Sequence, residues 1–217
     1  MVTTTDLTAI VASATGVNPQ SIVQIIRNLR SAGLLSSGGR GRHAAKMSAK
    51  DAALVIVAML ISDRPTDAAQ AVKDSRHLVW VAWREATKPE PSIFVFPDGD
   101  RGENGAAGLP LQLIDALVHV LKKLAAWKPG AGRSTVKICF DTEDLSCQIV
   151  TSAGEQRYFV TEQWAERITA LNAKGEEDLK IWKALRKSYQ LSRISVRRTI
   201  HHNTLFEIAQ LFAEART

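Results

Sequence analysis

The sequence predicts an α+β fold, in which an N-terminal group of helices precedes a mixed region of helices and antiparallel strands. Three observations lead to this prediction. Apolar residues recur at helical spacing between residues 5 and 62, the segment 111–127 reads as one helix, and from Ser134 onward apolar and polar residues alternate as in strands. The 217 residues, 45% of them hydrophobic, suffice for one large domain or two small ones.

A short turn separates the first two expected helices. Thr5 or Asp6 can cap a helix that runs to about residue 14, and Thr15-Gly16-Val17 then breaks it. The second helix begins at Asn18-Pro19, because asparagine suits the N-cap and proline at the first helical position loses no hydrogen bond. We expect it to end near residue 32, before Gly33. Its buried stripe would consist of Ile22, Ile25, Ile26 and Leu29.

A third helix is expected over Ala52–Ile61, opened by a capping box of Ser48 and Asp51. Its apolar run is about half as long as a bilayer requires, so we interpret it as a buried helix. The first ten residues show no signal-peptide pattern. The sequence therefore predicts a cytoplasmic protein without membrane contact.

The middle of the chain is expected to be helical and then flexible. Asp63-Arg64-Pro65 is a helix breaker, and the pattern from Thr66 to about Ala86, with Trp80 and Trp83 on it, is mainly helical. A short strand, a flexible loop and an amphipathic helix are then expected at residues 93–96, 98–108 and 111–127.

The C-terminal part changes from helical to alternating spacing. The segments "STVKICF", "CQIVTS" and "RYFVT" are separated by turn residues and predict an antiparallel meander. Thr204, with Glu207 three residues later, is expected to cap the last helix. Before it we expect two helices and a strand, at residues 162–173, 176–188 and 194–200.

These elements suggest four parts along the chain. They are an N-terminal helical unit with a basic Gly-Arg arm, a helical connector, a flexible loop and an α+β region, at residues 1–62, 63–97, 98–108 and 109–217. We expect the last part to serve in oligomerisation or sensing. It could also bind a protein partner or a ligand.

Positive charge is concentrated near the N-terminus. The net charge of the chain is +6, yet the first fifty residues hold six basic side chains and one acid, Asp6. The remaining sequence is close to neutral. A localised basic surface is the footprint expected for a polyanionic partner.

The helix pair and its turn carry a resemblance to known DNA-binding modules. The segment "TGVNPQSIVQIIRNLRSAGLL", residues 15–35, resembles the turn and recognition helix of winged helix-turn-helix regulators. The "GGRGR" stretch falls where such domains carry their wing, and residues 3–62 resemble modules of bacterial, phage or mobile-element regulators. The resemblance implies double-stranded DNA as the partner.

The same resemblance implies that the second helix enters the major groove. Gln and Asn side chains suit bidentate hydrogen bonds to adenine, and Ser can bond a base edge or a phosphate. Arg27 could read guanine or bind a phosphate, and we favour phosphate. For Arg27 and Arg30, the alternative to a DNA contact is that they belong to an ordinary solvated helix face. The predicted DNA-binding residues are Asn18, Gln20, Ser21, Gln24, Arg27, Asn28, Arg40, Arg42 and Lys46.

Arg40 and Arg42 stand in a Gly/Ser stretch that offers little to a hydrophobic core. Glycines permit close backbone approach, and arginines on an extended arm fit a narrow A·T-rich minor groove. Two plainer interpretations remain open. The stretch can be a solvated linker, and the helix pair can be an ordinary packing unit.

Signals for catalysis are weak in this sequence, and we expect no enzyme, no cofactor and no metal. The five histidines, His43, His77, His119, His201 and His202, lack the spacing of a metal site. Cys139 and Cys147 could lie near each other across a hairpin, where we expect them to be unreactive, packed thiols. The acidic segment 98–105 has Leu109 where a calcium loop requires its last Glu.

Taken together, the residues favour a sequence-specific transcription regulator that binds double-stranded DNA as a homodimer. One alternative keeps the DNA and assigns a role in replication, partition or packaging. Another is a protein-interaction module whose helix-turn-helix does not bind DNA.

Overall fold

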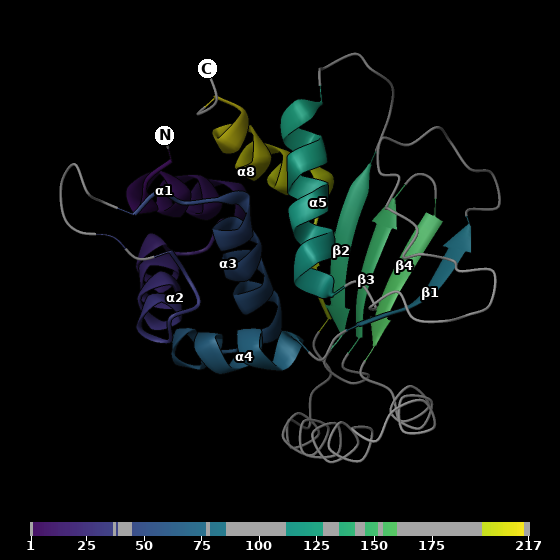
Figure 1. Cartoon of the computed structure of the whole chain (residues 1–217), viewed down its shortest axis with the longest axis horizontal. Coiled ribbons are helices and arrows are strands. Elements are labelled where there is room, and N and C mark those ends of the chain that lie inside the picture. The colour runs from purple at the N-terminus through teal and green to yellow at the C-terminus, as the bar shows by residue number, and fades with distance from the viewer. Residues whose placement is uncertain are drawn as a thin grey trace.

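The computed structural model describes residues 2–36, 38, 45–76, 79–85, 112–127, 135–141, 146–151, 154–159 and 197–214. In this part the protein is an α+β fold that combines a group of helices with one antiparallel sheet (Figure 1). The helices are α1 (Thr4–Thr15), α2 (Pro19–Ser31), α3 (Ala49–Ile61), the 3-10 turn η2 (Pro65–Asp67), α4 (Ala68–Ser75), α5 (Leu113–Ala126) and α8 (His202–Glu214).

Local capping sets the start of the first helix. Thr3 is the N-cap of α1, because its hydroxyl accepts a hydrogen bond from the Asp6 amide while the Asp6 carboxylate accepts one from the Thr3 amide. The predicted cap at Thr5 or Asp6 is therefore wrong by two or three residues. Asp6 is the third residue of the capping box, and the box fixes the N-cap three positions earlier.

The second helix begins where the sequence predicts, and the third begins at Ala49, three residues before the expected Ala52. The Asn18 side chain accepts a hydrogen bond from the Gln20 amide at 2.8 Å, and Pro19 occupies the first turn of α2. Gly16 and Gly33 adopt the left-handed conformation, with φ of 69° and 68°, so each ends its helix as glycine does most readily. Ser48 and Asp51 form the predicted capping box of α3.

The sheet has the order β1-β4-β3-β2-β5, and all its pairs are antiparallel. Its central β2–β3–β4 meander confirms the alternating pattern predicted after Ser134. The described strands are β1 (Val79–Glu85), β2 (Val136–Asp141), β3 (Ser146–Thr151), β4 (Gly154–Phe159) and β5 (Arg197–Ile200).

The predicted helix over residues 66–86 is wrong in its second half. Helix α4 ends at Ser75, and Trp80 and Trp83 lie on strand β1, which pairs with β4. The run "VWVAW" is rich in β-branched and aromatic residues, which suit a strand. The expected helical connector at 63–97 therefore supplies an edge strand of the sheet.

Thr204 does not cap the last helix. Helix α8 begins at His202, so Thr204 lies inside it, and its hydroxyl donates to the Ala14 carbonyl of α1 at 3.1 Å. A contact across helices, rather than local capping, uses this side chain. Four other predicted segments, the strand at 93–96, the loop at 98–108 and the helices at 162–173 and 176–188, lie outside the described residues.

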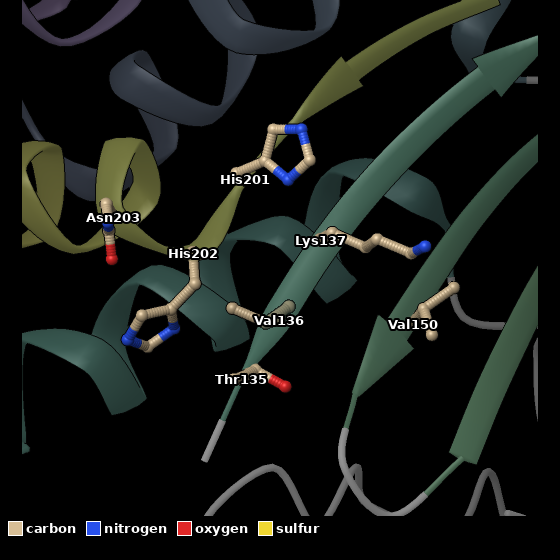
Figure 2. Close-up of a pocket in the computed structure, with 7 residues that line it drawn as sticks. All are labelled: Thr135, Val136, Lys137, Val150, His201, His202 and Asn203. Carbon is tan, nitrogen blue, oxygen red and sulfur yellow. The ribbon is translucent and has the colours of Figure 1, made fainter. Parts of the chain in front are cut away.

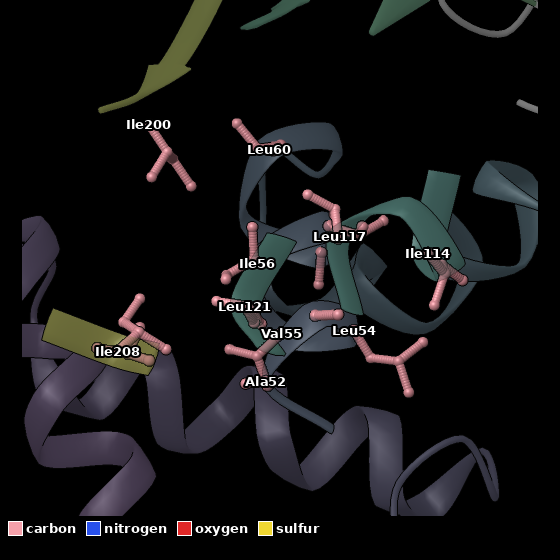
Figure 3. Packing of buried hydrophobic residues seen from close by; sticks show 14 of the residues in the cluster. Ala52, Leu54, Val55, Ile56, Leu60, Ile114, Leu117, Leu121, Ile200 and Ile208 are labelled. Carbon is pink, nitrogen blue, oxygen red and sulfur yellow. The ribbon is translucent and has the colours of Figure 1, made fainter. Parts of the chain in front are cut away.

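Helix α3 is at the centre of the core. From Asp51 to Ile61 every residue except Met59 is buried. Figure 3 shows side chains of α3 packed beside Leu117, Leu121 and Ile208 of α5 and α8. One continuous hydrophobic cluster extends from Val2 to Ala209, so α5, α8 and the sheet share a core with the first 62 residues. No helix in the described part combines the length and apolar character that a bilayer crossing requires.

Arg198 of β5 holds the end of α3. Its Nη1 donates to the carbonyls of Leu60 and Ser62, both at 3.0 Å, and its Nη2 bonds the Asp63 carboxylate. Carbonyls at the end of a helix lack partners within it and carry partial negative charge, so a guanidinium there is favourable. The sheet is thereby attached to α3 by polar contacts as well as by apolar packing.

We expect Arg198→Ala to lower the free energy of unfolding by about 2–3 kcal/mol, because hydrogen bonds to a charged group contribute more than neutral ones. Urea unfolding followed by circular dichroism measures the change. Lys122→Ala, at an exposed position on α5, serves as the control and should shift stability by less than about 0.5 kcal/mol. Equal stability of the two variants would contradict a structural role for Arg198.

Candidate nucleic-acid interface

Helix α2 presents one polar stripe, which we define as Gln20, Gln24, Arg27 and Ser31. These positions are spaced by four, three and four residues and so share one helix face. Gln20, Arg27 and Ser31 are exposed, and Gln24 is half-buried. The opposite face is buried in the core as the sequence predicts, through Ile22, Ile25, Ile26 and Leu29.

Both flanks of this helix are attached to neighbouring elements. On one side, Arg30 Nη2 donates to the Thr4 hydroxyl of α1 at 2.8 Å. On the other, Asn28 Nδ2 donates to the Pro65 carbonyl of η2 at 2.6 Å. Two long-range bonds on opposite flanks oppose rotation of α2 about its axis, so the polar stripe keeps its outward orientation.

Asn28 differs from the other predicted DNA contacts on α2 because both the oxygen and the nitrogen of its side-chain amide are bonded within the protein. Its Oδ1 accepts from Gln24 Nε2 at 3.2 Å while its Nδ2 bonds Pro65. Ser21 lies two turns before Asn28 on the same half-buried flank. The geometry thus gives Asn28 a structural task and leaves Gln20 and Arg27 as the most accessible polar side chains of the predicted set on α2.

Asn18 lies at the start of α2 and is exposed. Its Oδ1 is used by the helix cap, so its remaining hydrogen-bonding group, the side-chain NH2, is a donor. A donor at the N-terminus of α2 suits an acceptor such as a phosphate oxygen or a base carbonyl. The N-cap role and a DNA contact are therefore compatible at this residue.

The predicted arm is described only at its two ends. Arg40 and Arg42 lie outside the described residues, while Lys46 is exposed near the start of α3. The ends meet at one carboxylate: Asp51 accepts from the amide and hydroxyl of Ser36, at 2.9 and 3.0 Å, and from both groups of Ser48 at 2.7 Å.

Asp51 is only 3% exposed. Burial by itself would raise the pKa of this carboxyl, but the hydrogen bonds from Ser36 and Ser48 outweigh it and hold the pKa below the ordinary value. A lowered pKa in the folded state means that the ionised group stabilises the fold above the ordinary carboxyl pKa of about 3.9. That contribution is lost only as the pH falls through the lowered value.

Basic side chains in the described N-terminal part differ in availability. Arg27, Lys46 and Lys50 are exposed, whereas Arg30 is half-buried and bonded to α1, with its Nε buried and without a hydrogen-bond partner. Arg30 therefore holds α2 to α1, which favours a structural role for this residue over a DNA contact. The charge that remains accessible lies on the polar stripe and beside the arm.

A second concave feature lies at the start of α8, where a pocket of about 360 Å³ opens beside β2 and β3 (Figure 2). Burial lowers the pKa of His202, which also packs against the rings of Trp127 and Phe206. This environment favours the neutral form of the His202 imidazole. Among the described residues no three ligating side chains gather to hold a metal ion. The pocket is lined by Thr135, Val136, Lys137, Val150, His201, His202 and Asn203.

Cys139 and Cys147 are both buried and free. The register pairs Cys139 with Gln148 and Phe140 with Cys147, so the two cysteines are one position out of step and belong to opposite faces of the sheet. Burial raises the pKa of the Cys147 thiol far above its usual value, and the nearby Cys139 raises it further by a smaller amount. A neutral, enclosed thiol is a poor nucleophile.

Sequence reasoning missed two roles that depend on distant partners. Arg198 follows Arg197 within the strand expected at residues 194–200, and its place at the end of α3 has no local signal. Asp51 was recognisable as part of a capping box, but its bonds to Ser36, fifteen positions away, were not. A serine close to a glycine-rich stretch gives no indication of such a partner.

Comparisons with known proteins found nothing to add. No family model, curated protein or solved structure matches this chain.

We expect Asn28→Ala to reduce the free energy of unfolding by about 1 kcal/mol, since it removes hydrogen bonds and leaves the Pro65 carbonyl without its donor. Gln20→Ala, at an exposed site on the same helix, should change it by less than about 0.5 kcal/mol. Denaturant midpoints of the two variants provide the comparison. If Asn28→Ala proved as stable as Gln20→Ala, Asn28 would return to the set of free surface residues.

Proposed function

We propose that this protein is a sequence-specific regulator of transcription that binds double-stranded DNA through α1 and α2 as a helix-turn-helix. The observation that carries the proposal is the polar stripe of α2, which faces outward while Arg30 and Asn28 fix the helix on both flanks. A helix that reads a major groove needs an accessible polar face and a rigid mounting. The resemblance to winged helix-turn-helix regulators of bacterial, phage or mobile-element type supports the same assignment.

The side chains of the stripe suit different parts of a duplex. Gln20 and Gln24 lie in the first half of α2, where recognition helices contact base edges, and each amide can both donate to and accept from adenine. Gln24 would exchange its bond to Asn28 for one to DNA. Arg27 lies one turn further along and is exposed, which suits a phosphate contact that fixes the register.

A homodimer is part of this proposal. A single helix-turn-helix contacts a short site, and two copies related by a two-fold axis would read two half-sites about one helical turn apart. Selected binding sites should therefore be inverted repeats with that spacing.

We expect the full-length protein to bind duplex DNA with a steep loss of affinity as salt rises, because phosphate contacts release counterions. On a site selected from random duplexes, Gln20→Ala or Gln24→Ala should cost about 1–3 kcal/mol, with little effect on random DNA. Arg27→Ala should weaken binding to both.

Fluorescence anisotropy at fixed salt measures these affinities, with Lys122→Ala on α5 as the control. The proposal fails if the full-length protein shows no affinity for any duplex at low salt. Equal losses on selected and random DNA would remove the glutamines from base reading. Reporter transcription from the selected site then distinguishes a regulator from a replication, partition or packaging protein.

Replacing Arg40 and Arg42 together with alanine should leave the fold intact and weaken DNA binding. If these arginines enter the minor groove, the loss is larger for sites with A·T-rich flanks, since a narrow groove has enhanced negative potential. The measurement compares wild type and double variant on A·T-flanked and G·C-flanked duplexes at one salt concentration. An equal loss on both would indicate phosphate contacts, and no loss would identify a linker.

A further inference from the structure

Asp51 does more than cap a helix. In a plain capping box one acidic side chain serves one N-cap residue, and α1 has such a box: exposed Asp6 bonds only to Thr3 among the contacts of the described residues. Asp51 serves Ser48 in the same way, but it also receives two hydrogen bonds from Ser36. The second pair of bonds is not needed to start α3.

Ser36, the additional partner of Asp51, lies on the other side of the basic arm in the sequence. Ser36 precedes residues 37–47 and Ser48 follows them, so one carboxylate bonds both ends of the segment that contains Arg40 and Arg42. Ser36 contributes its amide to Oδ1 and its hydroxyl to Oδ2. Hydrogen bonds to an ionised, largely buried carboxylate are stronger than neutral ones, so Ser36 and Ser48 are both held firmly to one group.

Each end of the segment is also fixed by a second contact. On the α2 side, the Gly33 amide bonds the Arg30 carbonyl and the Leu34 amide bonds the Leu29 carbonyl, which is a Schellman turn. On the α3 side, the Met47 amide donates to the Val2 carbonyl at 3.0 Å. Leu35 and Met47 are both only 5% exposed, so a buried side chain lies near each end of the segment.

We infer that Asp51 is a positioning residue for DNA binding, which fixes the ends of the basic arm beside the C-terminal end of the recognition helix. This inference rests on the proposed function. Ser36 follows the last residue of the polar stripe, Ser31, by five positions and is held to α3. The arm therefore begins at a defined place relative to the stripe, and its contacts with DNA would cost less ordering entropy than those of a free linker.

The first test requires no DNA. Trypsin can cleave after Lys46, whose following residue Met47 is buried and hydrogen-bonded, so cleavage there requires local opening of the arm's end. We expect Asp51→Asn to accelerate this cleavage by about tenfold, and Ser36→Ala by a smaller factor, because each removes bonds that oppose opening. Unchanged rates in both variants would overturn the inference.

Two control variants separate anchoring from general weakening. Asp115→Asn removes an exposed acid from the first turn of α5, and Ser62→Ala removes a hydroxyl that bonds only within α3 among the described contacts. Neither should accelerate cleavage after Lys46. Ser36→Ala keeps the capping box of α3 intact, so it tests the anchor even if Asp51→Asn unfolds.

The second test is a double-variant cycle on DNA binding. Ser36→Ala or Asp51→Asn should weaken binding, and the loss should overlap with that of the Arg40→Ala, Arg42→Ala pair, because all act through one arm. We expect the arginine pair to lose several-fold less affinity in the Asp51→Asn background than in wild type. Fully additive losses would overturn the inference. If wild type binds no DNA while the trypsin result holds, the proposed function fails and the anchoring stands.

Discussion

The described fold depends on a helix that has no polar face. Helix α3 is buried on all sides between Ala52 and Ala58, so it is stable only when other elements surround it. The helices α2 and α4 cover one part of it, and α5 and α8 cover another, as Figure 1 shows. The polar groups at its two ends are bonded by side chains: Ser48 and Asp51 at the start, and Arg198 at the end. Burial and capping together fix where the neighbouring helices can lie.

The elements that the sequence predicted well are those with a local cause. Helix α2 starts and ends as expected because Asn18, Pro19 and Gly33 act within their own turns. The meander after Ser134 follows from alternation between apolar and polar residues, which needs no knowledge of the partner strand. The exposed face of α2 followed from the same reasoning, since a buried stripe defines its opposite.

Predictions were wrong where a distant partner decides the structure. Strand β1 was expected to be helical, because a short run with Trp80 and Trp83 fits either period until its pairing with β4 is known. Thr204 has the spacing of a cap, but its hydroxyl bonds α1 instead. Asn28 likewise appeared to belong to the outer face of α2, and η2, which bonds it, lies 37 positions further along the chain. Periodicity places a residue on a face without revealing what covers that face.

The shared core also determines how the proposed DNA-binding region can be studied. A fragment of residues 1–62 contains the polar stripe and the excess charge, but it lacks Leu117 and Leu121 of α5 and Ile208 of α8, which belong to the cluster around α3. It also lacks Pro65, which bonds Asn28, and Arg198, which bonds the last turn of α3. Cutting there would expose apolar side chains of α3 and release one flank of α2. Weak binding by such a fragment would therefore reflect a loosened recognition helix as much as a missing contact with DNA.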